Sequence, residues 1–396
     1  MLNRNTTTKS WMVASLLAAT SVFAQDSNNA QAPATKCRPQ KSYEQGHELT
    51  ASQMMAAYNA PARIDVRGAW DFYATGSFIY WQPTQENMEL GIAVPNGTIA
   101  LVSTTATQNP GSVVNMNFNY KPGFKVGLGM NFDYDNWDGY AEYTWFHGTN
   151  SQSSNTQGDT GAIWLFGYSP SVLNSGNFVA NAVSESWKLK MDFADVQLAR
   201  SYYVGTKLSF RPFVGARGAW IRQRANYAAS LNTALAFSQG TGTATSGRSV
   251  SSNQNSTSWG VGPSLGLDTN WMLGYGLRIA GKAETDLLYT RYTTRTSELA
   301  FTTATGAILG QEQVKQKHVA YLRPHANLEM GFGWGSYFDN NNWHFDLLAT
   351  YGFQVFWNQN MFRHFTTTPT TSQAISNVPN GDLYVQGLNL TARLDF

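Results

Sequence analysis

The chain has 396 residues, a formal net charge of +2 and only 13% charged residues, about half the usual share. Aromatic residues make up 14% of the sequence, and 35 residues are glycine. This composition excludes an intrinsically disordered chain, which needs low hydrophobicity and high net charge. The net charge is also too small to indicate a nucleic-acid-binding protein.

The first 24 residues have the pattern of a secretory signal peptide. Arg4 and Lys9 supply the positive start, an apolar run extends over 11–23, and the small residue Ala24 follows it. We expect cleavage after Ala24. A short anchoring helix is the alternative, although the run is shorter than the roughly 20 residues that a membrane-spanning helix needs. The sequence therefore predicts an exported protein.

Residues 25–65 are polar and are expected to form a periplasmic N-terminal segment. Residues 50–53 have the spacing of a capping box, and 54–58 are expected to form a short helix that ends before Pro61. Cys37 is the only cysteine, so a disulfide within the chain is excluded. We expect an ordinary free thiol, and a cross-link to another molecule is the alternative.

From residue 66 onward the dominant pattern has a period of two, which is typical of β-strands with one apolar face. Phe124, Val126 and Leu128, for example, alternate with small or polar residues. A change of phase near Ala194 and Asp195 predicts a β-bulge. The pattern recurs in ten segments, at 70–80, 124–134, 141–145, 187–198, 208–220, 259–267, 277–283, 320–332, 343–353 and 384–396.

The predicted connections alternate between short and long, as they do in outer-membrane barrels with short periplasmic turns and long extracellular loops. The short ones are expected near 135–138, 201–205, 271–275 and 336–342. The long ones are expected near 83–112, 149–184, 225–256, 297–315 and 358–382. Within the first long connection, 91–94 and 98–102 flank a Pro-Asn-Gly turn. A barrel of twelve strands is therefore the alternative to one of ten.

Three features distinguish a membrane barrel from a soluble β-sandwich. The strands are longer than the five or six residues typical of soluble sheets. Aromatic residues cluster at strand ends, where the interfacial girdles of membrane barrels lie. The last strand ends in Phe396, which resembles the signal read by the outer-membrane assembly machinery. We predict an all-β fold, a closed antiparallel up-and-down transmembrane β-barrel over 66–396, in contact with outer-membrane lipid and that machinery in a Gram-negative bacterium.

Three stretches of the sequence match a known pattern. They are 69–71 leading to 78–82, 123–129 followed by 135–138 and 143–146, and, most specifically, 211–221. Together they resemble the Legionella major outer membrane protein family of pore formers, which is found also in chlamydia-like bacteria. The resemblance extends roughly over 66–396. It implies an outer-membrane pore and brings no catalytic residues.

The polar faces of the predicted strands supply candidate pore-lining residues. If these faces point inward, the lumen contains Arg211, Arg217, Arg278, Lys282, Glu284, Arg323, His325, Glu329, Asp346 and Arg393. Charged rings set the ion preference of pores, and the excess of Arg and Lys predicts mild anion selectivity. The alternative is a salt-bridged core, because about eight strands just enclose side chains and about sixteen leave a channel. The apolar stretch 161–168 is expected to narrow the mouth, pack on the loops or continue a strand.

We expect a porin-like channel for passive diffusion of ions and small hydrophilic solutes. A surface-exposed structural protein or adhesin with an occluded barrel is the alternative. A hydrolase on the barrel rim is a third reading, based on His325 with Glu329 or His344 with Asp346. The sequence has no metal-binding histidine spacing, phosphate loop or nucleophile elbow, so we expect no enzyme activity, cofactor or metal. Nucleic acid is not an expected partner, and association of identical chains stays open.

Overall fold

The computed structural model describes residues 60–67, 71–94, 111–132, 135–156, 162–164, 179–237, 245–303, 305, 307–367 and 374–396. The chain divides into two compact units, Met1–Tyr58 and Asn59–Phe396, and every described residue belongs to the second. The expected signal peptide, the short helix at 54–58 and Cys37 lie outside the described residues. Within the described ranges, no helix is long and apolar enough to cross a membrane.

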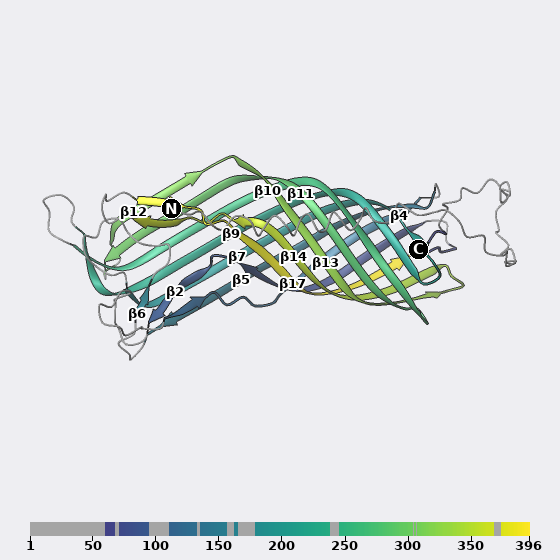
Figure 1. Ribbon diagram of the computed structural model, residues 1–396, viewed down its shortest axis with the longest axis horizontal. Helices are drawn as coiled ribbons and strands as arrows, with labels where there is room; N and C mark the ends of the chain where they lie inside the picture. Colours follow the sequence, from purple (N-terminus) through teal and green to yellow (C-terminus); the bar gives the residue numbers. More distant parts are fainter. Residues whose placement is uncertain are drawn as a thin grey trace, which may run out of the picture. The chain divides into compact units, whose positions relative to one another are not determined.

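Ten strands form the wall of a closed antiparallel barrel (Figure 1). In chain order they are β1 (Phe72–Gln85), β4 (Lys121–Asn131), β5 (Trp137–Asn155), β7 (Val179–Arg200), β9 (Leu208–Phe237), β10 (Thr245–Gly274), β11 (Leu277–Thr303), β13 (Val319–Phe338), β14 (Trp343–Asn360) and β17 (Gly381–Asp395). Each wall strand pairs with the next, and β17 pairs with β1. Closure satisfies the backbone groups of the wall without water. The prediction of a ten-strand barrel is confirmed.

Short strands accompany the wall at both ends. They are β2 (Glu89–Val94), β3 (Ser112–Asn115), β6 (Ala162–Trp164), β8 (Tyr202–Val204), β12 (Ile308–Gln316), β15 (His364–Thr367) and β16 (Ala374–Asn377). β2 pairs with β3 and β6, and β6 pairs with β7, so β2 does not enter the wall and the twelve-strand alternative is wrong. Residues 98–102 lie outside the described part of the chain. Within the apolar stretch 161–168, the structure places Ile163 in strand β6, fully buried.

The wall strands extend far beyond the length that a bilayer requires. β9 and β10 have 30 residues each, whereas a tilted membrane strand needs about 9–11. Most of 225–256, which we expected to be a loop, is therefore paired strand. Residues 149–155 of β5 and 182–184 of β7, from the next expected loop, are paired strand as well. In β9 the apolar residues of this part, such as Tyr227, are buried inside and Asn226 is exposed outside, whereas β10 also turns polar residues such as Ser252 and Gln254 into the barrel.

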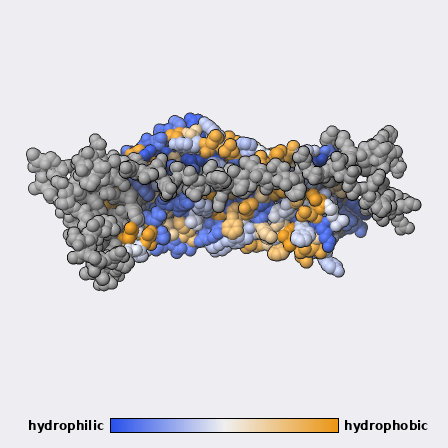
Figure 2. Space-filling view, in the orientation of Figure 1, coloured by the Kyte–Doolittle hydropathy of each residue, from blue (hydrophilic) through white to orange (hydrophobic). Residues whose placement is uncertain are grey.

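The outer surface of the barrel has an apolar belt next to the short turns. Leu128, Met330 and Phe332 are 67–68% exposed there, and Figure 2 shows hydrophobic residues gathered over this half of the barrel. From Leu208 to Trp220, β9 covers about 40 Å along the strand, or about 30 Å along the barrel axis at a tilt of about 40°. That height matches the hydrocarbon thickness of a bilayer.

Strand β7 shows that the two faces of the wall exchange polarity along the barrel. Near the short turn, Val196 is 60% exposed on the outside and Asp195 is buried inside. Further along, Leu189 is buried inside and Lys188 is exposed outside. The pairing of β7 with β5 and β9 keeps one register through 187–200, so the predicted bulge is wrong. The apolar residues of β7 change from the outer to the inner face because the medium outside the wall changes from lipid to water.

Phe396 closes the barrel at the end of the chain. Its backbone N–H donates to the carbonyl of Phe72 (3.0 Å), and the N–H of Phe72 donates to the carbonyl of Phe396 (3.3 Å). Its ring lies 5.8 Å from that of Trp343 between centroids. Its role in assembly stays a prediction.

Candidate functional site

The interior of the barrel is the candidate site, and all ten predicted luminal residues lie on the inner face of the wall. Inward positions follow from burial, since alternate residues of each wall strand are buried between exposed neighbours. The ten do not form one ring. Nine belong to two clusters of charged residues, and Arg323 lies apart from them.

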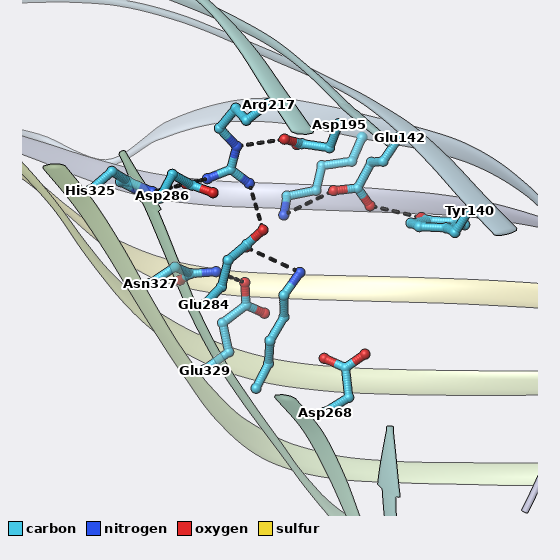
Figure 3. A network of polar contacts seen from close by, with 12 residues as sticks. Tyr140, Glu142, Asp195, Arg217, Asp268, Glu284, Asp286, His325, Asn327 and Glu329 are labelled. Carbon is cyan, nitrogen blue, oxygen red and sulfur yellow. Dashed lines mark hydrogen bonds and ion pairs between the residues drawn. The ribbon is translucent and has the colours of Figure 1, made fainter. Parts of the chain in front are cut away.

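Arg217 is the centre of a buried network in the middle of the lumen (Figure 3). Its guanidinium donates to Asp195 on β7 (Nε to Oδ1, 2.5 Å), and to Glu284 (3.2 Å) and Asp286 (2.6 Å) on β11. The Nδ1 atom of His325 on β13 lies 2.6 Å from Oδ2 of Asp286. The network therefore connects four strands, β7, β9, β11 and β13, across the intervening β10. Because all five side chains are buried, removal of the one arginine would leave carboxylates without compensation.

Two lysines enlarge this network. The Nζ atom of Lys282 lies 3.4 Å from Oε2 of Glu284, and that of Lys125 lies 3.5 Å from Oε1 of Glu142. Glu329 accepts hydrogen bonds from side chains of β13, β14 and β17 at 2.9–3.0 Å. Figure 3 shows Glu142, Glu284 and Glu329 pointing toward one another from different strands.

A second cluster of ion pairs lies nearer the short turns. The pairs are Arg211 with Asp138 and Asp268, Arg278 with Asp346, and Arg393 with Asp395. The side chains of Asp268, Lys282 and Arg393 keep 24–26% of their exposure although they point inward. These three side chains are therefore less completely enclosed than Arg217 and its partners.

Six carboxylates that make ion pairs with luminal side chains were not among the predicted site residues. They are Asp138, Glu142, Asp195, Asp268, Asp286 and Asp395. When these six carboxylates and Lys125 are included, the ion-paired luminal residues of the described wall have no excess of Arg and Lys over Asp and Glu. The premise of the predicted anion selectivity is therefore wrong. Glu142 and Asp395 lie on the polar faces of the predicted strands 141–145 and 384–396, which was a signal that could have identified them, whereas Asp138 lies in a predicted turn.

Two aromatic side chains close the lumen beyond the Arg217 network. Phe193 on β7 stacks on Phe356 on β14, with 5.5 Å between ring centroids and 19° between ring planes. These strands lie on opposite sides of the ten-strand ring, so the contact crosses the lumen. The ring of His325 stacks on Phe356 with centroids 4.1 Å apart. We call Phe193 and Phe356 the aromatic septum.

Beyond the aromatic septum the lumen contains a hydrophobic core. Trp81 and Trp187 of the wall are 2% and 0% exposed. The same cluster contains three residues from outside the wall: Leu90 of β2, Phe362, which follows the end of β14, and Phe365 of β15. The period-two pattern predicts that the apolar residues of β7 face lipid, whereas Trp187 and Leu189 lie inside the barrel here.

Arg323 lies beside aromatic rings and a methionine, and it makes no ion pair with a carboxylate of the described residues. Its guanidinium lies 4.7 Å from the ring centroid of Tyr321 and 5.8 Å from that of Tyr292. Its Nη2 atom donates to the sulfur of Met361 at 2.9 Å. Cation–π contacts of this kind are most favourable where the cation is desolvated.

The two histidine–carboxylate pairs considered for a hydrolase are not assembled as hydrogen-bonded pairs. His325 contacts Asp286, and Glu329 accepts bonds from amide and hydroxyl groups. His344 pairs with Asp395, while Asp346 pairs with Arg278. Over the part of the chain that the structure describes, no group of three or more His, Cys, Asp or Glu residues is placed to hold a metal ion.

Comparison with known proteins identifies a family. The sequence profile described as Legionella pneumophila major outer membrane protein precursor matches residues 65–396. A comparison with curated proteins finds no match.

Among solved structures, the barrel is similar to several outer-membrane proteins. One is the outer membrane protease OmpT from Escherichia coli (9% identity, 85% of this chain and 99% of that chain, TM-score 0.35). Others are a Pseudomonas aeruginosa FadL homologue (10%, 82% and 90%, 0.27) and Ail, the attachment invasion locus protein of Yersinia pestis (9%, 82% and 99%, 0.19). At these identities the likeness is one of fold alone.

Proposed function

Because the chain belongs to the Legionella pneumophila major outer membrane protein family and is an outer-membrane barrel, we propose that it forms a narrow channel for ions and small hydrophilic solutes. The channel is closed in the conformation described here. Passage requires the aromatic septum and the inserted segments to move.

The observation that carries this proposal is the charged half of the lumen, which lies within the apolar belt. Ion pairs cover its wall, and three of their side chains keep about a quarter of their exposure. Replacing buried ion pairs with apolar side chains is often neutral or stabilising, so a barrel with only a structural role gains little from them. Charged side chains along a hydrated lumen are instead what channels use to admit ions.

The closure consists of parts that can change position. Three residues that pack in the lumen lie outside the wall strands: Leu90 in β2, Phe362 between β14 and β15, and Phe365 in β15. Their departure from the lumen therefore breaks no pairing between wall strands. The septum contact joins two side chains and not two backbones. A rotamer change of Phe193 or Phe356 therefore separates them.

A second candidate is a permanently occluded structural barrel that presents its extracellular part to other surfaces. The septum contact across the lumen and the hydrophobic core beyond it favour this candidate. So do the 30-residue strands, which hold a folded structure well outside the apolar belt.

Conductance of the refolded protein in planar lipid bilayers separates the two candidates. We expect small, infrequent conductance steps from the wild-type barrel and a several-fold higher open probability from the Phe193→Ala/Phe356→Ala variant, because this variant lacks the septum. Phe353→Ala is the matched control, since Phe353 lies on the same strand and is 57% exposed on the lipid side. If the septum variant folds with native β-sheet circular dichroism and stays silent, the channel is disproved and the structural candidate stands.

A further inference from the structure

Four basic side chains gather on the outer wall where the apolar belt ends. Lys188 and Lys190 lie on β7, and Arg222 and Arg224 lie on β9. They point outward, because the residues that alternate with them are buried inside the barrel. The register places Lys188 opposite Arg224 and Lys190 opposite Arg222. We call these four residues the cationic patch.

The positive charge of the cationic patch is poorly compensated. Like charges directly opposite each other destabilise a sheet, and the patch contains two such pairs. In the described part of the barrel, the ion pair to the patch comes from Asp192, whose Oδ2 lies 3.2 Å from Nη2 of Arg222. That carboxylate also accepts from Tyr143 (3.1 Å) and contacts His147 (3.3 Å). One shared carboxylate cannot neutralise four cations, so the patch fits an anionic partner.

The register also gives the depth of the cationic patch in the membrane. Trp145 and Trp220 flank Asp192 on the neighbouring strands, and Trp259 is the next residue in the same row. Tryptophan marks the interface between hydrocarbon and headgroups. The patch occupies the next two outward positions along each strand, about 7 Å apart, which is the level of lipid headgroups. Because the long connections mark the extracellular side, these headgroups belong to the outer leaflet.

The strands on either side of the patch add hydrogen-bonding groups and no acid. Thr257 and Asn255 of β10 lie opposite Arg222 and Arg224. His147 and Thr149 of β5 lie opposite Lys190 and Lys188. Such a surface suits a ligand that combines anionic phosphates with polar sugar groups.

We propose that the cationic patch is a binding site for the phosphorylated glycolipid of the outer leaflet, lipopolysaccharide, through the phosphates of its lipid A. Arginine binds phosphate oxygens through its planar fork and lysine as a compact charge. The acyl chains of the lipid then lie on the apolar belt below Trp220. This site does not depend on whether the barrel conducts.

Native mass spectrometry of the refolded barrel in detergent tests this site with bis-phosphorylated lipid A as the probe. Wild type binds it about 30-fold more tightly than Arg222→Gln/Arg224→Gln, since each basic residue near a membrane surface contributes about one factor of five. Lys188→Gln/Lys190→Gln, which keeps the pair between Arg222 and Asp192, loses affinity to a similar extent. Lys315→Gln/Lys317→Gln removes the same charge from exposed positions in and after β12 and binds like wild type.

Thermal denaturation of the same proteins supplies an independent readout. Without lipid, the Lys188→Gln/Lys190→Gln variant is at least as stable as wild type, because repulsion between opposite like charges is relieved and the pair between Arg222 and Asp192 stays. With bis-phosphorylated lipid A, wild type becomes more stable than the patch variant. Dephosphorylated lipid A does not produce this change. The proposal is overturned if the patch variants bind lipid A as wild type does, or if the Lys315/Lys317 control loses as much affinity. It is also overturned if inorganic phosphate alone stabilises the barrel as much as lipid A.

Discussion

The two halves of this barrel are built from the same strands and have opposite interiors. In the half within the apolar belt, the wall presents Val196 and Val214 to lipid and Asp195 and Arg217 to the lumen. In the half beyond the belt, the same strands present basic and hydroxyl side chains outward and a hydrophobic core inward. The register does not change between them. Only the medium outside the wall changes.

A period-two pattern indicates that the two faces of a strand differ in polarity, and it does not indicate which face lies inside. Within lipid, the apolar face is outside and the barrel interior is polar. Above lipid, the barrel follows the rule for water-soluble proteins and buries its apolar face. A strand that crosses the boundary, such as β7, therefore shows an apparent shift of phase that has no counterpart in its backbone.

The largest expected effect comes from the polar interior. Arg217→Met removes the one cation shared by three buried carboxylates, so we expect the free energy of unfolding to fall by about 3–5 kcal/mol. Urea-induced unfolding in lipid vesicles measures it. Arg200→Gln is the control, because Arg200 pairs with Asp135 where both side chains are 34–46% exposed, and such pairs contribute about 0–1 kcal/mol. Equal losses in both variants would mean that the Arg217 network is not shielded from water.

The hydrophobic interior beyond the belt should respond to truncation as a soluble core does. Leu189→Ala leaves a cavity at a fully buried position and should cost about 2–5 kcal/mol. Leu128→Ala is the counterpart on the lipid side, 68% exposed, where acyl chains fill the space and the cost should be about 2 kcal/mol or less. The comparison between the two halves fails if Leu128→Ala is the more destabilising change.

A charge placed on the outer face should be harmful only within the belt. Leu128→Arg puts a cation against hydrocarbon and should cost about 2–4 kcal/mol near the bilayer midplane. Ser153→Arg places the same side chain at an exposed outward position of β5 beyond the belt, where surface substitutions stay within about 0.5 kcal/mol. Vesicle unfolding experiments on both variants locate the boundary, and an equal response would place Ser153 in lipid as well.

The smallest effect concerns Glu185, a buried carboxyl of β7 beyond the belt. Burial, with a further contribution from Glu89, raises its pKa to about 8 from 4.5. Below pH 4.5 it is protonated in both states. Between pH 4.5 and 8 the unfolded chain ionises while the folded chain keeps the proton, so stability falls as pH rises and levels off above pH 8.

Glu185→Gln should remove that dependence. We expect the variant to be more stable than wild type by about 1–2 kcal/mol at pH 8 and no more stable at pH 4, since glutamine does not ionise but remains a buried polar group. Unfolding at both pH values checks this, with Ser153→Glu, at an exposed outward position of β5, as a comparison for a carboxyl in water. A pH-independent difference would show that Glu185 is ionised in the folded protein.

The sequence by itself determined the ten wall strands, their alternating faces within the belt and the position of the short turns. Those features follow from contrasts between neighbours in the chain, such as Leu128 beside Gly127 and Gly129, and so can be read locally. The inward position of the ten predicted luminal residues also follows from this alternation.

Only the tertiary structure decided what the lumen contains. Phe193 meets Phe356 because closure of ten strands puts β7 opposite β14, and no local pattern indicates which strands will face each other. Arg217 meets Glu284 and Asp286 on β11, which is not paired with β9, for the same reason. The direction of Leu189 depends on the height at which β7 leaves the lipid, which is set by strand tilt and by the neighbours of β7 in the ring.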